Sequence, residues 1–200
     1  MTKATQESAR FFVALLPPVA VQDEIMAIKR DIWQRFGSQG ALNSPPHITL
    51  QPPFQWPEGQ VGELEQVLAD FARGRSPVPV QLQNFSAFAP RVIYVDVVHT
   101  EALMALQPGL MAHLEATCGI VDAVAKGRPQ FMPHATVGFK DLTHEAFHAA
   151  WAEFKDRPFA AEFVVPQLTL LHHGGSSSDR PRERLGGQKW QIFSEFLLST

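Results

Sequence analysis

The chain has 200 residues, of which 45% are hydrophobic and 18% charged, the usual composition of a globular protein. Its formal net charge is −3, so nucleic-acid binding would depend on a local basic patch rather than on overall charge. One cysteine, Cys118, excludes an intrachain disulfide, and its helical context indicates a buried thiol. The apolar run 11–16 is too short for a secretory signal or a membrane span, so we expect a cytoplasmic protein without membrane association.

The first half of the chain alternates strand and helix patterns. Short apolar runs predict strands at 11–16, 47–51 and 78–88, with Pro52-Pro53 closing the second of them. Apolar residues at helical spacing predict one helix that ends at Gly37 and another around 64–71.

The second half repeats this order and adds a closing strand. A β-branched run predicts a strand at 91–98, and a leucine series predicts a helix that kinks or breaks at Pro108. A strand at 131–139 and a helix over 147–154, with Thr143 as its cap, come next. A long strand at 159–172 and a last strand at 190–198 complete the chain.

Two segments in opposite halves share one pattern, Pro-His-x-Thr-aliphatic, at 46–50 and 133–137. Residues i and i+2 of a strand point to the same side. His47 and Thr49 therefore share one strand face, as do His134 and Thr136, while the aliphatic residues between them point into a core. The duplication makes a functional role more plausible than either copy would alone.

The repeat predicts an α+β fold, with two lobes related by a pseudo-twofold axis and both His-x-Thr strands lining a central cleft. We expect a single domain over 1–200, with lobes at about 10–88 and 91–173 and a closing strand at about 189–198. A doubly wound parallel sheet explains less, because no glycine-rich phosphate loop follows any strand.

Two opposed imidazoles suit acid–base chemistry on a phosphodiester. A neutral ring accepts a proton from the attacking water or ribose hydroxyl, and a charged ring donates one to the leaving oxygen on the opposite side. The hydroxyls of Thr49 and Thr136 hold the non-bridging oxygens. The sequence itself leaves open which histidine, His47 or His134, is the acid. The scheme requires no metal and no cofactor.

These motifs resemble those of the two-histidine phosphoesterases, and in particular the bacterial branch similar to 2′-5′ RNA ligases. The opening FFVALLPP and the block PPHITL also resemble that family, so the likeness covers essentially the whole chain. It implies a bilobal fold and metal-independent hydrolysis of 2′,3′-cyclic phosphates or 2′-5′ linkages in RNA or nucleotides, with RNA ligation as the reverse reaction. It also implies His47 and His134 as the acid–base pair and Thr49 and Thr136 as phosphate anchors.

Other residues are candidate substrate contacts. Trp56 follows the first motif in a turn and is a candidate for base stacking. Lys140 stands just after the second motif, where some members of the family have an arginine, and it either holds phosphate or is solvated. His172 ends a predicted strand and either contacts substrate or is exposed. The only local basic patch is a loop at 176–184, which contains Arg180, Arg182 and Arg184.

Two alternatives to a metal-independent enzyme remain. The same site would also serve a module that binds a nucleotide or an RNA end without turnover. A weaker alternative is a metal site built from His47, His134, His172 and His173. We expect a monomer whose partner is a nucleotide or an RNA end that carries a cyclic phosphate or a 2′-5′ linkage.

Overall fold

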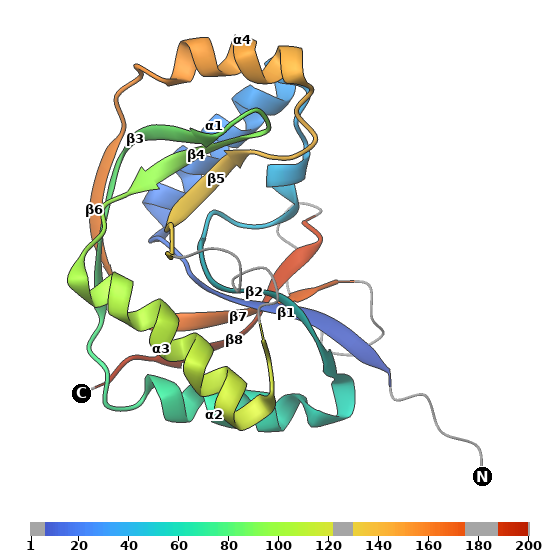
Figure 1. Cartoon of the computed structure of the whole chain (residues 1–200), viewed down its shortest axis with the longest axis vertical. Helices are drawn as coiled ribbons and strands as arrows, with labels where there is room; N and C mark the ends of the chain where they lie inside the picture. Colours follow the sequence, from blue (N-terminus) through green and yellow to red (C-terminus); the bar gives the residue numbers. More distant parts are fainter. Residues whose placement is uncertain (1–6, 122–129, 175–187, 200) are drawn as a thin grey trace.

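A computed structural model describes residues 7–121, 130–174 and 188–199. Strands and helices alternate along the described chain much as the sequence predicts (Figure 1). Their bounds are β1 Ser8–Leu15, α1 Val19–Phe36, β2 Ile48–Pro57, α2 Val61–Ala72, β3 Val78–Phe88, β4 Val92–Val97, α3 Glu101–Cys118, β5 His134–Gly138, α4 His144–Phe154, β6 Ala160–Val165, β7 Gln167–His173 and β8 Trp190–Leu197. The described helices include none that is long and apolar enough to cross a membrane.

The strands form two antiparallel sheets of four strands each. The first sheet has the order β2-β1-β7-β8 and the second has the order β5-β4-β3-β6. The two motif strands, β2 and β5, are thus equivalent edge strands, and they lie beside each other between the sheets. This arrangement confirms the predicted α+β fold with its internal duplication.

Each sheet is covered on one face by a pair of helices, and the two halves of the chain exchange one helix. Helices α2 and α3 pack against the first sheet, whereas α1 packs on β5 and against α4, over the second sheet (Figure 1). The helix that follows β1 therefore covers the sheet that contains β5. Because helices cover only one face of each sheet, the other face is left for the motif side chains.

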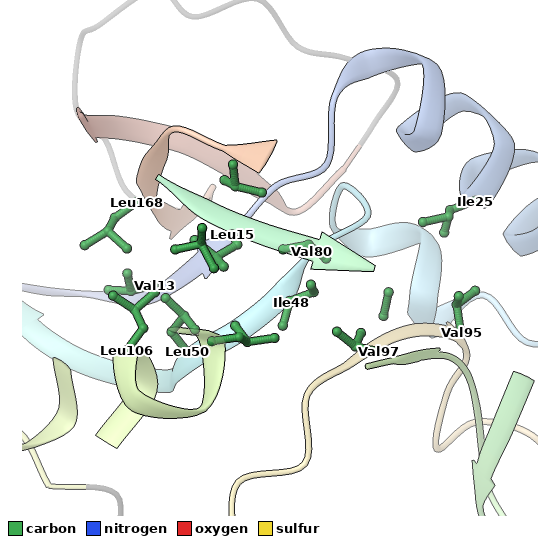
Figure 2. Packing of buried hydrophobic residues seen from close by; sticks show 14 of the residues in the cluster. Val13, Leu15, Ile25, Ile48, Leu50, Val80, Val95, Val97, Leu106 and Leu168 are labelled. Atoms are coloured by element: carbon green, nitrogen blue, oxygen red, sulfur yellow. The ribbon is translucent and has the colours of Figure 1, made fainter. Parts of the chain in front are cut away.

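The core is continuous across both sheets. Figure 2 shows side chains from β1, β2, β3, β4 and β7 packing together with Leu106 of α3. The four aliphatic residues that alternate with the motif side chains, Ile48, Leu50, Ala135 and Val137, are all fully buried in this cluster. Their burial confirms the predicted alternation and leaves the histidines and threonines on the opposite strand face.

Each sheet combines strands from both halves of the chain. Strand β3 belongs to the second sheet, and β7 belongs to the first, next to β1. The connection from β6 to β7 passes between the sheets at Pro166, so the expected long strand 159–172 is two strands. Proline has no N–H to donate to a sheet, which makes residue 166 a natural point of exchange.

Prolines inside two other elements do not end them. Strand β2 continues through Pro52-Pro53 to Pro57, because it is an edge strand and its register with β1 shifts between Phe54 and Gln51. Sheet edges and bulges tolerate proline. Helix α3 continues through Pro108, because a buried leucine stripe (Leu103, Leu106, Leu110, Leu114) holds both of its halves on the core. The second motif strand begins only at His134, directly after Pro133.

Candidate active site

His47 stands immediately before β2, and a backbone hydrogen bond fixes its ring. Its Nδ1 lies 2.7 Å from the carbonyl oxygen of Pro45. Because a carbonyl only accepts, Nδ1 must carry the proton, and Nε2 is the nitrogen that exchanges a proton with substrate. The ring also packs against Phe12 of β1, with the ring centres 4.8 Å apart.

His134 opens β5 and repeats this geometry. Its Nδ1 lies 2.7 Å from the carbonyl oxygen of Met132, so Nε2 is again the nitrogen that exchanges a proton. Tyr94 and Phe88 flank the ring, at 5.1 and 5.0 Å between ring centres. Both motifs therefore use the carbonyl two residues before the histidine, and both place an aromatic side chain from a neighbouring strand against the imidazole.

Different charged residues stand beside the two motif strands. A buried lysine of α1, Lys29, lies near His47, and its ammonium donates to the carbonyl of Ser44 at 3.1 Å. Burial, the charge of Lys29 and the proximity of His134 outweigh the bond to Pro45 and lower the pKa of His47 to about 3. The pKa of Lys29 itself falls to about 7, because burial disfavours its charged form.

On the other strand, Asp96 of β4 is the direct cross-strand partner of His134. Side chains in directly opposite positions point to the same sheet face and lie close together. Thr136 pairs in the same way with Tyr94, so the hydroxyl, the imidazole and the carboxylate all lie on one face of the second sheet.

The segments around the two motifs are joined by Asp141. Its carboxylate accepts hydrogen bonds from the Ser38 hydroxyl and from the backbone N–H groups of Gln39 and Gly40, each at 2.7 Å. The Ser38 hydroxyl in turn accepts from the N–H of Phe139 at 3.0 Å. A Cβ atom on Gly40 would lie only 2.8 Å from the Phe139 ring, so glycine permits this close approach.

The structure separates some predicted contact residues from the motif pair. Trp56 pairs with Ala9 on the core face of β1, packs against the core and donates to the Gln60 carbonyl at 2.9 Å. His172 also lies on that face, against Phe11 and Phe193. Alternation along the strand instead places His173 on the face that holds His47.

Lys140 is exposed, and its ammonium lies 5.7 Å from the Phe139 ring. Arg180, Arg182 and Arg184 lie outside the described residues. Within the described residues, no group of three or more His, Cys, Asp or Glu side chains is placed to hold a metal ion. His172 lies on the core face of the sheet and so on the opposite face from His47, with which it would have to share the metal in the four-histidine site considered above.

Sequence reasoning missed Lys29, Asp96 and Tyr94. The apolar spacing of the first helix predicts which apolar residues are buried, but it does not predict burial of Lys29, since lysines in such helices are usually exposed to solvent. Asp96 and Tyr94 alternate along β4, which marks them as sharing a face, but only pairing with β5 places that face beside His134. The sequence names both His172 and His173, and only the register between β7 and β1 shows that His173 is the one on the face of His47.

Comparisons with known proteins agree with this geometry. The family model of the 2′-5′ RNA ligase superfamily matches residues 17–177. A Bacillus pumilus protein named “Putative phosphoesterase” is 28% identical over 193 residues, covering 94% of this chain and 97% of that protein. A protein of the same name from Geobacillus thermodenitrificans is 27% identical over 193 residues, covering 94% and 96% of the two chains.

Solved structures show the same fold. Escherichia coli LigT complexed with 3′-AMP matches with a TM-score of 0.64 and 19% identity, over 97% of this chain and all of that chain (100%). TT0787 of Thermus thermophilus matches with a TM-score of 0.64 and 20% identity, over 94% and 97% of the two chains. With two His-x-Thr strands paired as equivalent edges and a family model that spans most of its length, this chain belongs to the 2′-5′ RNA ligase superfamily of two-histidine phosphoesterases.

Proposed function

We propose that this protein is a metal-independent phosphodiesterase that acts on 2′,3′-cyclic phosphates or 2′-5′ linkages of RNA or nucleotides. The observation that carries the proposal is the pair of imidazoles, each held by an Nδ1 hydrogen bond to a backbone carbonyl of its own segment, with the pKa of His47 lowered by burial and by Lys29. A pair of unlike protonation states is what general acid–base catalysis requires. The LigT structures complexed with 3′-AMP and NADP+ support a nucleotide as the partner.

The charges favour one assignment of roles. Since burial and the charge of Lys29 lower the pKa of His47, His47 is the proposed base and His134 the proposed acid. In hydrolysis of a cyclic phosphate, Nε2 of His47 accepts a proton from water as the water oxygen bonds to phosphorus. The P–O bond on the opposite side breaks, and Nε2–H of His134 protonates the departing ribose oxygen. The product is a ribose phosphomonoester.

The hydroxyls of Thr49 and Thr136 share the faces of the two histidines and donate to the non-bridging phosphate oxygens. When a 5′-hydroxyl takes the place of water, the same steps form a 2′-5′ phosphodiester, so ligation needs no additional group. We propose that the protein works as a monomer in the cytoplasm. Lys140 is a further candidate for phosphate binding, at the end of the second motif strand.

The test measures turnover of 2′,3′-cyclic AMP and of a short RNA ending in a 2′,3′-cyclic phosphate, with EDTA present. Wild type is compared with the double variant His47→Ala/His134→Ala and with a matched control, His144→Ala/His148→Ala, on the exposed face of α4. We expect ring opening by wild type and by the control variant but not by the motif variant, and the position of the product phosphate identifies the bond that breaks.

The alternative is a module that binds nucleotides or RNA ends without turnover. Binding of nucleotide by wild type without any product, under the same conditions, would favour that alternative. Activity that disappears with EDTA and returns with a divalent cation would contradict the metal-independent mechanism. Equal turnover by the motif variant and the control would remove His47 and His134 from catalysis.

A further inference from the structure

Aromatic and cationic side chains continue from His47 along the same face of the first sheet. Phe12 contacts His47 on one side and Trp190 on the other, each with 4.8 Å between ring centres. Trp190 is in turn flanked by the guanidinium of Arg10, at 5.6 Å, and by the ring of His173, at 5.0 Å. We call the five residues Arg10, Phe12, His173, Lys189 and Trp190 the sheet-one band.

The strand register places four of the five band residues on the motif face, and Lys189 stands just before Trp190 at the start of β8. Arg10 and Phe12 alternate along β1, and Phe12 pairs with Leu171 of β7. His173 follows Leu171 by two residues and pairs with Trp190 of β8. Phe12 and Leu171 form a small buried cluster, separate from the main core, against which Trp190 packs. The band therefore spans β1, β7 and β8 and ends at the catalytic histidine of β2.

The band is also a local concentration of positive charge in a chain with net charge −3. Burial and then the nearby charges of Arg10 and Lys189 lower the pKa of His173. Arg10 and Lys189 are exposed, and Trp190 is half-buried. An aromatic platform between two solvent-accessible cations matches the chemistry of single-stranded nucleic acid, where bases stack and phosphates carry the charge.

We propose that the sheet-one band is a subsite for a second nucleotide, with the base stacked on Trp190 and the phosphate held by Arg10 and Lys189. This inference rests on the proposed function and deepens it by naming the substrate class. The preferred substrate is then an oligonucleotide whose reacting phosphate lies between His47 and His134. An isolated cyclic mononucleotide occupies the catalytic groups but leaves the band empty.

The experiment compares kcat/KM for two substrates, 2′,3′-cyclic AMP and an RNA trinucleotide ending in a 2′,3′-cyclic phosphate. Trp190→Ala is matched by Trp33→Ala, which removes a partly exposed tryptophan from α1. We expect Trp190→Ala to lower kcat/KM about tenfold or more for the trinucleotide and less than about twofold for cyclic AMP, since stacking contributes only when the second base is present. Trp33→Ala should change neither value.

A second variant keeps the inference testable if Trp190→Ala fails to fold. Arg10→Gln is compared with Arg73→Gln, an exposed arginine of the α2 end that pairs with Asp70. Losing one phosphate contact should weaken trinucleotide binding and reduce the slope of log affinity against log salt concentration by about one. Arg73→Gln should leave that slope unchanged.

The outcomes separate failure of this inference from failure of the proposed function. If wild type cleaves neither substrate, the function fails, and the band is then tested by anisotropy of a 5′-fluorescein-labelled trinucleotide with the same four variants. Binding weakened by Trp190→Ala and Arg10→Gln, but not by their controls, supports the band in either case. If Trp190→Ala affects both substrates equally, Trp190 supports His47 through Phe12, and the second-nucleotide subsite is wrong.

Discussion

His47 and His134 occupy equivalent places on edge strands, yet Lys29 lies near the first and Asp96 lies across from the second. Each ring also has the same hydrogen bond to a carbonyl two residues earlier. Duplication accounts for the shared geometry, and residues outside the motif account for the difference. Side chains on α1 and β4, which the motif itself does not contain, therefore give the two rings different neighbours, and the proposed division into base and acid rests on that difference.

The largest expected effect comes from removing either imidazole. His47→Ala and His134→Ala should each lower kcat by about 10²–10⁴-fold on a phosphodiester with an alcohol leaving group. A nucleotide 4-nitrophenyl ester, whose leaving group needs no proton, distinguishes the two roles. We expect His134→Ala to recover most of its activity on this ester and His47→Ala to recover little, because only the acid becomes dispensable.

The control for this experiment is wild type on both esters, which calibrates the gain from the better leaving group alone. The opposite pattern, with recovery by His47→Ala, would reverse the assignment of roles and show that bound substrate overrides the charges of Lys29 and Asp96. Recovery by neither variant would show that both rings act on the nucleophile or on the phosphate itself.

The next effect concerns the free energy of unfolding and isolates Lys29. Because burial lowers its pKa from 10.5 to about 7, the unfolded chain binds one more proton than the folded chain between these pH values. Wild-type stability therefore rises with pH across that window, by up to about 1.4 kcal/mol per unit. Lys29→Met lacks this term, so its stability relative to wild type should fall as pH rises from 7 to 10 in urea unfolding.

Lys155→Met provides the control, since Lys155 is half-exposed at the end of α4. A pH-independent difference between Lys29→Met and wild type would show that Lys29 is not a buried titrating group. The same variant also tests the comparison of the two rings. Without the lysine charge the pKa of His47 should rise, so the acidic limb of kcat/KM should move to higher pH.

A smaller effect is expected from the threonine hydroxyls. If the threonines bind phosphate as proposed, Thr49→Val and Thr136→Val each remove a hydrogen bond to a charged oxygen, and we expect kcat/KM to fall about ten- to hundredfold. Thr169→Val is a matched control, because Ala14 pairs with both Thr49 and Thr169, in the same row across the first sheet. Thr169 is fully buried, and its hydroxyl has no partner among the described residues. Its loss should change kcat/KM by less than about twofold.

Equal losses of kcat/KM in Thr49→Val and Thr136→Val would indicate that the two threonines contribute equally to phosphate binding, although the two histidines differ in their neighbours. A loss with only one of them would extend the asymmetry to the phosphate. If Thr169→Val lowered kcat/KM as much as Thr49→Val, the effect would come from packing on that face rather than from contact with substrate.

The sequence predicts what local alternation determines. Ile48 and Leu50 are apolar and separated by one residue, so His47 and Thr49 must point the other way, and the burial of the aliphatic residues confirms it. Periodicity also locates the helices, because an apolar stripe such as that of α3 is a local pattern. These features required no knowledge of which strand pairs with which.

What the sequence could not predict depends on contacts between distant segments. Consecutive residues of a strand face opposite ways, so His172 and His173 must differ, but only pairing with Phe11 shows that His172 is the one on the core side. The exchange of β3 and β7 between sheets and the packing of α1 on β5 have the same origin. Lys29 enters the site through that exchange of helices, which explains why the motif strand alone gave no sign of it.

The smallest effect concerns the link between the two motif segments. Burial alone would raise the pKa of Asp141, but hydrogen bonds from Ser38, Gly40 and Gln39 outweigh it and lower the pKa below its usual value of 3.8. A carboxyl with a lowered pKa stabilises the fold above its unfolded pKa, and this contribution is lost as pH falls through the folded value. Since the group is largely exposed, we expect Asp141→Asn to cost only about 1 kcal/mol at pH 7.

Urea unfolding of wild type and Asp141→Asn from pH 7 to pH 3 tests this, with Asp156→Asn as the control at a position whose side chain is 85% exposed. The deficit of Asp141→Asn should shrink as pH falls below about 4, because wild type then loses the charge that the variant lacks. If the loss of stability does not depend on pH, the stabilisation by Asp141 comes from packing and neutral hydrogen bonds rather than from its negative charge. Since Asp141 joins the loop before His47 to the turn after β5, a lowered kcat in this variant, beyond that of Asp156→Asn, would show that the two histidines depend on one shared support.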